Sequence, residues 1–428
     1  MKKLILSLFI SSGLFSSGNA QLDTVSIGAG YANTVWYNLD DDTETSAAGN
    51  SWDLGFQING FSGAILANTA YGANLYLYPK GAIADTATLD TNGLSTWTPW
   101  HNPSDTWNSG ALNNGRTGSA TDLGWGTYSV TTHHITGDSV FVWITASGDV
   151  KKLWISKLAS GKYHFTVANL DGSGKVHRVL DKDDFPGKNF GYYSIAQDKN
   201  LNLEPNGMWH LVFSKYIEYV PTPYSVSGIR ANVNLGLSKA EKLADAATFE
   251  DVKSLMFTAK INKVGYDWKS YNFATRAYNI EDSVAYFVKM DSLNYWKLEM
   301  KGFGGSRNGN YIFKKTKIVL EAAPEDTTGK DTTSVETFIN EVSTATGFTV
   351  FPNPSTDKQI TLSLDAGANE ALYLNLVSLS GELVHNQNIE ASAIQSDIQL
   401  NLNHLQSGIY FLSISNERGS SIQKLVLQ

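Results

Sequence analysis

The central region of the chain repeats itself, and this repeat limits the possible folds more than any other feature of the sequence. Short segments recur in the same order in a second copy, which argues against chance. We therefore predict two tandem modules, residues 21–183 and residues 184–320. The matched pairs are WYNL (36–39) with YYSI (192–195), SWDLGF (51–56) with MWHLVF (208–213), FSGAILAN (61–68) with VSGIRANV (226–233), IADTATLD (83–90) with LADAATFE (243–250), THHITGDSVFVW (132–143) with RAYNIEDSVAYF (276–287), KLWIS (152–156) with KLEMK (297–301), and KYHF (162–165) with NYIF (310–313).

The repeated segments alternate between apolar and polar residues, which is typical of strands with one buried face. Aromatic and β-branched residues dominate these runs, for example SVFVWIT (139–145) and MWHLVFSKY (208–216). The predicted fold class is all-β, with two tandem modules and a small C-terminal β-sandwich. One helix is expected over residues 238–255, because Ser238 and Glu241 have the spacing of a capping box.

The first twenty residues have the pattern of a secretory signal peptide, with Lys2 and Lys3 before an apolar run and a small-residue cleavage site ending at Ala20. No later apolar segment reaches the length of about 20 residues that a membrane-spanning helix needs, so no transmembrane segment is expected. The chain has no cysteine, which excludes disulfides and thiolate chemistry. We therefore predict a secreted protein that is extracellular or attached to the outer-membrane surface.

The charge pattern narrows the choice of partners. The formal net charge is −8 and no cluster of Lys and Arg is present, so nucleic acid is not an expected partner. Two acidic runs, LDDDTE (39–44) and DKDDF (181–185), could bind calcium. Neither has the alternating ligands of a calcium loop, and we interpret both as solvated turns.

Catalytic motifs are absent from the sequence: there is no G-x-S-x-G, H-E-x-x-H or glycine-rich phosphate loop. Asp53 of the first copy corresponds to His210 of the second, which disfavours catalysis at this position and favours the neighbouring tryptophan as a core anchor. We expect a protein that is not an enzyme, although a carboxylate pair assembled by folding, as glycosidases use, stays open.

The C-terminal part of the chain has its own character. Residues 321–347 are acidic and threonine-rich, which is typical of a linker. Residues 348–428 contain short alternating strands and resemble the type A sorting domain of the type IX secretion system of Bacteroidota. The resemblance implies that the type IX machinery is a partner and that the chain is exported to the cell surface. It rests on Phe351-Pro352-Asn353-Pro354, Ser380-Gly381, Ser407-Gly408-Ile409-Tyr410 and Lys424-Leu425-Val426.

The repeated module resembles the HmuY family of haem-binding proteins of Bacteroidota. The resemblance covers most of residues 30–170, with a weaker second copy over 190–315. It implies a largely β fold and capture of haem as a cofactor through two axial side chains, His or Met. The residues that carry it are Trp52-Asp53-Leu54-Gly55-Phe56, Ser62-Gly63, Thr132 to Trp143, Gly148 to Leu153, and Tyr163-His164-Phe165.

Histidines are the candidate ligands in the first copy, because it has no methionine between Gln21 and Gly207. His133 and His134 are adjacent, so on a strand their side chains point to opposite faces, and only one can face a given pocket. A second ligand would come from His101, because neutral imidazole binds haem iron and zinc. The alternative is a polar strand start whose imidazoles bond to backbone or water.

The first copy also carries an insertion over residues 97–119 that the second copy lacks. Its tryptophans, Trp97, Trp100 and Trp107, lie among turn-forming residues. Exposed aromatic rings in loops bind flat ligands, so the candidate ligands are a porphyrin or a glycan, and a protein surface is a further alternative. The other interpretation is a long surface loop whose tryptophans cover the sheet.

Overall fold

The structure is a computed structural model. It describes residues 21–428 except 60–61, 80–87, 120, 207, 234, 242–254, 256, 292, 320–347, 365–371, 379–382, 390–397 and 417–418. The expected signal peptide (residues 1–20) and the expected linker (321–347) lie outside the described residues.

The described chain is all-β, as predicted, and its helices are 3-10 turns of three residues each. The part of the chain before the linker contains β1 (Gln21–Ser26), β2 (Asn33–Tyr37), β3 (Glu44–Ala48), β4 (Leu54–Gln57), β5 (Ile65–Ala67), β6 (Asn74–Leu77), β7 (Gly126–Tyr128), β8 (Ile135–Gly137), β9 (Phe141–Ile144), β10 (Val150–Ala159), β11 (Lys162–Asn169), β12 (Val176–Asp181), β13 (Phe190–Ser194), β14 (Lys199–Leu201), β15 (Leu211–Tyr219), β16 (Pro223–Ala231), β17 (Gly236–Glu241), β18 (Lys269–Asn272), β19 (Ala277–Ile280), β20 (Val284–Lys289), β21 (Asn294–Phe303) and β22 (Asn310–Val319). The 3-10 turns are η1 (Ala29–Tyr31), η2 (Thr69–Tyr71), η3 (Leu94–Thr96), η4 (Ala111–Asn113), η5 (Lys182–Asp184) and η6 (Gly305–Arg307).

The expected helix over residues 238–255 is wrong where the structure describes it. Residues 236–241 form strand β17, which pairs antiparallel with β20 along its whole length. Leu237 is buried in the core and lies opposite Val288. Pairing with an apolar strand overrides the local helix preference, which is a weak influence by itself. Residues 242–254 lie outside the described part.

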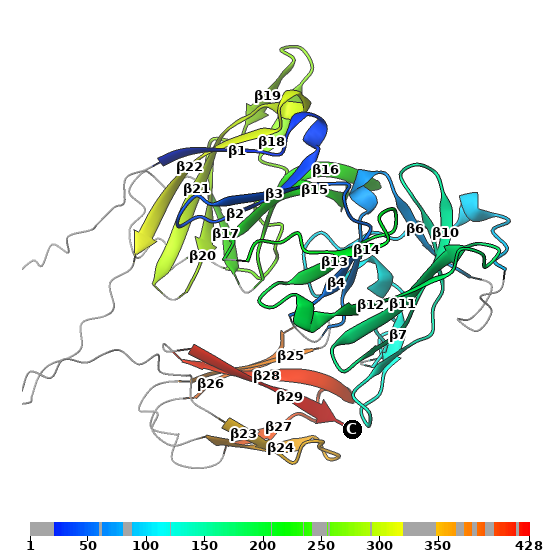
Figure 1. Cartoon of the computed structure of the whole chain (residues 1–428). Helices are drawn as coiled ribbons and strands as arrows, with labels where there is room; N and C mark the ends of the chain where they lie inside the picture. The colour runs from blue at the N-terminus through cyan, green and yellow to red at the C-terminus, as the bar shows by residue number, and fades with distance from the viewer. Residues whose placement is uncertain are drawn as a thin grey trace, which may run out of the picture.

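Two β-sandwiches make up this part of the chain (Figure 1). In the first sandwich, sheet β14-β13-β4-β5 packs against the larger sheet that contains β12-β11-β10-β9-β6, with the β7–β8 hairpin on the edge of β10. In the second, sheet β16-β15-β2-β3 packs against β1-β22-β21-β20-β17. Each sandwich encloses its own apolar core, built from the inward-facing residues of both sheets.

The two sandwiches have the same strand order, but each is completed by strands from the other repeat. Sheets β12-β11-β10-β9-β6 and β14-β13-β4-β5 of the first correspond to β1-β22-β21-β20-β17 and β3-β2-β15-β16 of the second. Because β12 corresponds to β1, the second structural repeat begins at Val176 and not at the predicted residue 184. Strands β1–β3 therefore open the first repeat and pair in the second sandwich, whereas β12–β14 open the second repeat and pair in the first. The two repeats thus exchange three strands, and the cores do not follow the predicted division between residues 183 and 184.

Backbone irregularities recur at matched positions of the two repeats. The pairing of β10 with β11 shifts register between Ile155 and Lys157, and the pairing of β21 with β22 shifts between Met300 and Gly302. These are the same positions when KLWIS is aligned with KLEMK. A bulge bends its strand and increases the local twist, so both large sheets curve at the same point.

The two sandwiches stack through their smaller sheets. A separate apolar cluster, which we call the junction cluster, lies between β2 and β15 on one side and β5 and β13 on the other. The stack therefore has four sheets, with an apolar layer between each neighbouring pair. The junction cluster consists of Trp36, Ala64, Leu66, Phe190, Tyr192, Trp209 and Val212.

The C-terminal unit is a third, smaller sandwich, below the other two in Figure 1. A sheet β23-β24-β27 faces a sheet β26-β25-β28-β29 across a core of aliphatic side chains. Its strands are β23 (Phe348–Phe351), β24 (Gln359–Leu364), β25 (Leu372–Ser378), β26 (Leu383–Ile389), β27 (Ile398–Asn401), β28 (Gly408–Asn416) and β29 (Gly419–Leu427).

Candidate ligand-binding hollows at the sandwich junction

The junction between the two large sandwiches contains two adjacent hollows, which share Trp36, Glu204 and Trp209. Trp36 lies on β2, and Glu204 and Trp209 lie on the segment that joins β14 to β15. The three shared residues therefore lie on an exchanged strand, β2, or on the segment that follows another exchanged strand, β14. Correct exchange between the repeats is the condition for either hollow to form.

The larger hollow has a volume of about 530 Å³. Indole rings and small polar side chains line it together, which is the composition of sites for polar organic ligands. Asn202 and Asn206 are exposed at its rim. The polar and aromatic residues of its lining are Trp36, Asn38, Thr43, Thr45, Asn202, Asn206 and Trp209, and the charged ones are Asp41, Lys188 and Glu204.

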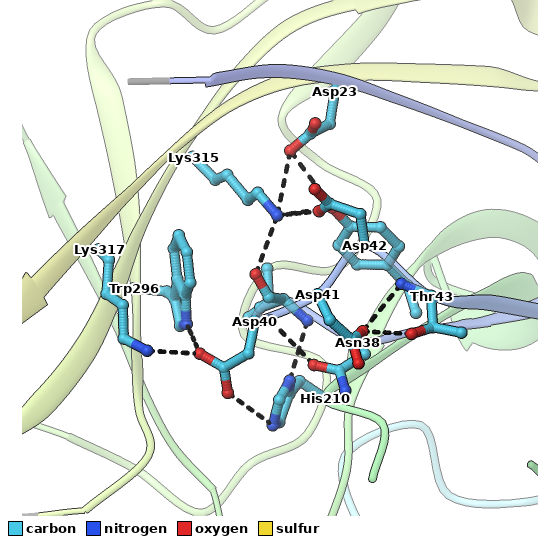
Figure 2. A network of polar contacts seen from close by, with 12 residues as sticks. Asp23, Asn38, Asp40, Asp41, Asp42, Thr43, His210, Trp296, Lys315 and Lys317 are labelled. Carbon is cyan, nitrogen blue, oxygen red and sulfur yellow. Dashed lines mark hydrogen bonds and ion pairs between the residues drawn. The ribbon is translucent and has the colours of Figure 1, made fainter. Parts of the chain in front are cut away.

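The turn between β2 and β3 forms one wall of this hollow and is fixed to the second sandwich (Figure 2). Lys315 on β22 is buried and donates to the carbonyl of Leu39 at 2.9 Å and to the hydroxyl of Tyr37 at 3.0 Å. Its ammonium group also forms an ion pair with Asp42. Asp23 of β1 lies 3.6 Å from the same ammonium group. Because these polar partners of the buried cation come from β1, from β2 and from the turn after β2, the network favours the exchanged pairing.

Asp40 continues this network on the other side of the turn (Figure 2). It accepts hydrogen bonds from Lys317 at 2.8 Å and from the indole of Trp296 at 3.2 Å. These contacts lower the pKa of Asp40 although partial burial acts in the opposite direction. The acidic run 39–44 was interpreted as a solvated turn, but two of its carboxylates bond to lysines of β22. Among the described residues, no group of three His, Asp or Glu side chains is arranged to hold a metal ion.

Asp53 and His210 have one structural role in the two repeats. The carboxylate of Asp53 accepts a hydrogen bond from the backbone N–H of Ile195 at 2.7 Å, and Nδ1 of His210 accepts from the N–H of Leu39 at 2.9 Å. Ile195 directly follows β13, and Leu39 is the second residue after β2, so each lies just beyond the end of an exchanged strand. Burial lowers the pKa of His210, which keeps its ring neutral and Nδ1 available as an acceptor.

The smaller hollow is a cavity of about 60 Å³ and contains a cationic side chain, Arg230 of β16. Its guanidinium lies 4.4 Å from the centre of the Trp107 ring and 4.8 Å from that of Tyr216. Burial lowers the pKa of Arg230 to about 10, so the group stays charged at neutral pH. The described chain places no carboxylate within ion-pair distance of it.

Glu204 is the acidic group of the junction and is almost completely buried. Its carboxylate accepts from the N–H of Asn189 at 2.8 Å and from the hydroxyl of Tyr192 at 3.2 Å. Burial is the largest cause of its shift and raises its pKa to about 7, against the lowering effect of these bonds and of Lys188. Glu204 therefore changes charge near neutral pH.

His101 is buried beside η2, and its Nδ1 lies 2.9 Å from the hydroxyl of Thr69. Burial lowers its pKa. His133 lies at the tip of the β7–β8 hairpin, with φ of 57°, and its Nδ1 is 2.8 Å from the hydroxyl of Tyr128. The carbonyl of His134 accepts the N–H of Ser129 at 2.8 Å and so closes the same hairpin. His101 and His133 thus have different neighbours and do not converge on one hollow.

The tryptophans of the insertion lie in three different clusters. Trp97 packs against Tyr78 on the outer face of the first sandwich, and Trp100 packs against Phe141 at its core. Trp107 alone of the three lines the junction, where its indole N–H donates to the carbonyl of Ala231 at 2.8 Å. The insertion is therefore a bridge to the second sandwich rather than a single aromatic surface.

Sequence reasoning missed Arg230, Glu204, Trp36 and Trp209 as site residues. Each is isolated in the sequence, and its burial depends on strand pairing that no local pattern reveals. One signal was available: Arg230 lies in a repeated segment whose counterpart is apolar. Val212 corresponds to Gly55 in the repeat, and Arg230 pairs with Val212 as Leu66 pairs with Gly55. The counterpart of Arg230 in the first repeat is therefore Leu66.

The residues of the expected sorting signal hold the end of the chain in place. The side chain of Asn353 donates to the carbonyl of Lys424 at 2.6 Å and accepts the N–H of Val426 at 2.9 Å. These two bonds attach β29 to the segment between the exposed prolines Pro352 and Pro354. Gly408 begins β28. Tyr410 is buried, and its hydroxyl donates to the carbonyl of Gln406 at 2.8 Å.

Comparison with known families decides the nature of the C-terminal unit. The family model described as the secretion system C-terminal sorting domain matches residues 349–428. These residues are a type IX secretion sorting domain. Because the sorting domain directs export, the chain is a secreted protein of a kind that is often attached to the cell surface, and the type IX machinery is its partner.

The sorting domain lies against the first sandwich, and Ile409, Phe411 and Lys424 line a hollow of about 300 Å³ together with residues of that sandwich. Lys424 of β29 donates to the hydroxyl of Tyr128 at 2.6 Å and lies 3.1 Å from Nδ1 of His133. The sorting domain therefore contacts the β7–β8 hairpin, which carries His133.

Other comparisons are weak. The dimeric latent PorU of Porphyromonas gingivalis has 10% sequence identity and a TM-score of 0.16, and the match covers 69% of this chain. The chain spans 31% of that PorU chain. No curated protein matches the sequence. No described helix is long and apolar enough to cross a membrane.

Proposed function

We propose that this secreted chain is a non-enzymatic binding protein that holds a glycan in the larger hollow at the sandwich junction. The observation that carries the proposal is the hollow of about 530 Å³ in which Trp36 and Trp209 lie beside Asn202 and Asn206. Its volume is within the range of sites for small organic ligands, about 300–1,000 Å³.

The chemistry of the walls fits a sugar ring. The hydroxyl groups of a sugar bond to amides and hydroxyls such as those of the rim. Trp36 and Trp209 are only 4% and 5% exposed, so they contribute an apolar floor to the hollow and not an open stacking surface. Thr45 of β3 and Thr43 add hydroxyl groups on the wall opposite Asn202 and Asn206. The sequence predicts ligand capture at the insertion, whereas we propose it at the junction. The insertion supplies Asn102, Pro103, Ser104 and Trp107 to the adjoining smaller cavity.

Haem capture is the finer prediction that the HmuY resemblance implies, and the candidate ligands do not fit it. Haem capture as the resemblance implies it takes two axial side chains that face one iron. His101 is buried against Thr69, whereas His133 bonds to Tyr128 and Lys424. No step of the proposed function therefore involves haem.

The test is a glycan array probed with the full secreted chain, followed by titration of the best glycan while tryptophan fluorescence is measured. We expect saturable binding that the double variant Asn202→Ala/Asn206→Ala weakens by about tenfold or more, because each amide supplies hydrogen bonds worth about 1 kcal/mol. The matched control is Asn386→Ala, an exposed asparagine of β26 in the sorting domain. Equal binding by the double variant and the control would sink the proposal.

A parallel titration with hemin separates the two ligand classes. A saturable Soret band that is lost in His101→Ala or His133→Ala would favour haem over a glycan. A flat response together with glycan binding supports the proposal made here.

A further inference from the structure

The smaller cavity contains two buried polar groups that the protein itself leaves without a partner. Nε of Arg230 and the hydroxyl of Tyr216 are shielded from solvent and make no hydrogen bond within the described chain. A second nitrogen of the guanidinium, Nη2, makes one long bond of 3.4 Å to the hydroxyl of Ser214. An unsatisfied buried group costs about 1–3 kcal/mol, and more when it is charged. Two such groups in one cavity indicate that an acceptor from outside the chain belongs there.

The stacking of Arg230 determines which of its donors remain available. Trp107 and Tyr216 lie within cation–π distance of its guanidinium, and neither ring offers a hydrogen-bond acceptor comparable to a carboxylate. Its N–H donors lie in the plane of the group and point outward from the edge. A planar, doubly accepting anion is the partner that matches this edge.

Arg230 and Trp107 each occur in only one copy of the repeat. Arg230 belongs to the second copy, where the first has Leu66 at the matching register. Trp107 belongs to the insertion that only the first copy carries, and its indole N–H is tied to Ala231, next to Arg230. The insertion therefore reaches across the junction and stacks on a cation that the other copy does not have. Packing alone explains neither feature, because Leu66 fills the same junction without a charge.

We propose that the smaller cavity is an anion site in which the edge of the Arg230 guanidinium binds a carboxylate, of either a small free acid or a uronic-acid unit of a glycan. The volume of about 60 Å³ corresponds to about two water molecules. A carboxylate group fits this space, whereas a whole sugar does not. The inference goes beyond glycan binding in the larger hollow and holds for a free acid even if no glycan binds.

Glu204 makes the site sensitive to pH. It lines the same cavity, and the groups that face its carboxylate are Asn189, Tyr192 and Lys188. With a pKa of about 7, Glu204 is neutral in mildly acidic solution and anionic in mildly basic solution. A bound carboxylate is repelled by the anionic form, so binding weakens as the pH rises through 7.

The test compares acetate with chloride at constant ionic strength and measures the thermal midpoint and calorimetric affinity of the full chain. We expect acetate to raise the midpoint of the native chain at pH 6 more than chloride does. Arg230→Gln loses this difference, with an affinity at least about tenfold weaker, or 1.4 kcal/mol. Arg230→Lys keeps the charge without the planar edge, so it recovers only part. The control is Arg178→Gln, which removes a surface arginine paired with Asp198.

Sugar acids then distinguish the two sources of the carboxylate. Glucuronate that binds more tightly than acetate, with glucose inactive, identifies a uronic-acid unit. Acetate that binds as tightly as glucuronate or more tightly identifies a small free acid. Glu204→Gln should abolish the loss of acetate affinity between pH 6 and pH 8. The proposal is overturned if acetate and chloride act equally on the native chain, because water then satisfies the guanidinium. It is also overturned if acetate acts equally on the native chain and on both Arg230 variants, and the Lys variant decides this point if the Gln variant does not fold.

Discussion

The two large sandwiches have the same strand order but are made from the chain in different ways. The first is built from one continuous stretch, from β4 to β14. The second joins the two ends of the region, because β1–β3 pair with β15–β22. The comparison teaches that a repeat visible in the sequence need not be a folding unit. Here the folding unit is displaced from the repeat by three strands.

The same comparison distinguishes the residues of the proposed site from those of the scaffold. Where the repeats agree, the residues build sheets, bulges and cores. Where they differ, the residues gather at the junction: Arg230 replaces Leu66, and Trp107 belongs to an insertion of one copy. Counting back from Trp209 and Trp52, Glu204 corresponds to Ala47. Divergence between the copies has therefore concentrated polar and aromatic side chains on one interface.

The largest expected effect comes from cutting the chain. The fragment 184–320, a module by sequence, should not fold, because it lacks the buried side chains of β1–β3 and the turns beside them. Removing Val25, Ile27, Val35, Tyr37 and Leu39 forfeits about 10 kcal/mol at about 2 kcal/mol each, which matches the stability of a whole domain. Fragment 50–204, which keeps the first sandwich together, should melt cooperatively. Circular dichroism with thermal unfolding decides this, and the opposite result would refute the exchange.

A smaller effect is expected from Glu204, which only the second repeat carries. Its folded pKa of about 7 exceeds the ordinary value of 4.5, so the native state binds more protons between these values and loses stability as the pH rises through them. Glu204→Gln should therefore be more stable than the native chain at pH 8 by about 3 kcal/mol, and nearly equal to it at pH 5. Urea denaturation at the two pH values measures this. A variant that is less stable at pH 8 would contradict the burial of the charge.

Variants of Asp53 and His210 test whether the two repeats both use a side-chain acceptor to bind a backbone N–H just after an exchanged strand. Asp53→Ala and His210→Ala each leave a backbone N–H without an acceptor, at Ile195 and Leu39. We expect each to lower the free energy of unfolding by about 1–3 kcal/mol. Asp53→Asn and His210→Asn keep an acceptor and should recover much of the loss. Unfolding by urea measures all four, and a loss in only one sandwich would show that the roles differ.

The smallest effect concerns the hairpins. The sorting domain contacts the β7–β8 hairpin of the first sandwich through Lys424, and no such contact is described for β18–β19 of the second. The contact of Lys424 with His133 is exposed and its bond to Tyr128 is only part-buried, so Lys424→Ala and His133→Ala should each change the unfolding free energy by less than about 1 kcal/mol. A loss above about 2 kcal/mol in thermal unfolding would mean that the sorting domain is an integral part of the first sandwich.

Much of the architecture could be predicted from the sequence. Alternating apolar residues reveal strands because the side-chain period of a strand is two, and this was enough for the all-β class. The sorting domain was predicted from a few turn and strand residues at the C-terminal end, and the family match over 349–428 confirms it. Alternation shows which face of a strand is buried but not which strand lies beside it. The pairing of β2 with β15 could therefore not be predicted.

The site was harder to predict than the fold. Interest centred on the histidines and tryptophans because these residue types bind ligands, yet Trp97 and Trp100 are packing residues in the first sandwich. In the sequence, Arg230 resembles any other polar residue of a strand, because the rings that contact it belong to other segments. The segment 238–241 has helical spacing, but β20 offers it an apolar strand to pair with. In each case the deciding contact is distant in sequence.

The pairing of Gln21 with Lys315 has a kinetic consequence. Closing so long a loop costs more entropy than closing a hairpin, and contacts between distant residues slow folding. The first sandwich has all its strands as soon as β14 exists. In the second, β2 can pair with β3 and β15, but β1 has no partner strand until β22 follows. Strand β1 is therefore the last strand to pair. Any factor that binds β1 slows the folding of the second sandwich and leaves the folding of the first unchanged.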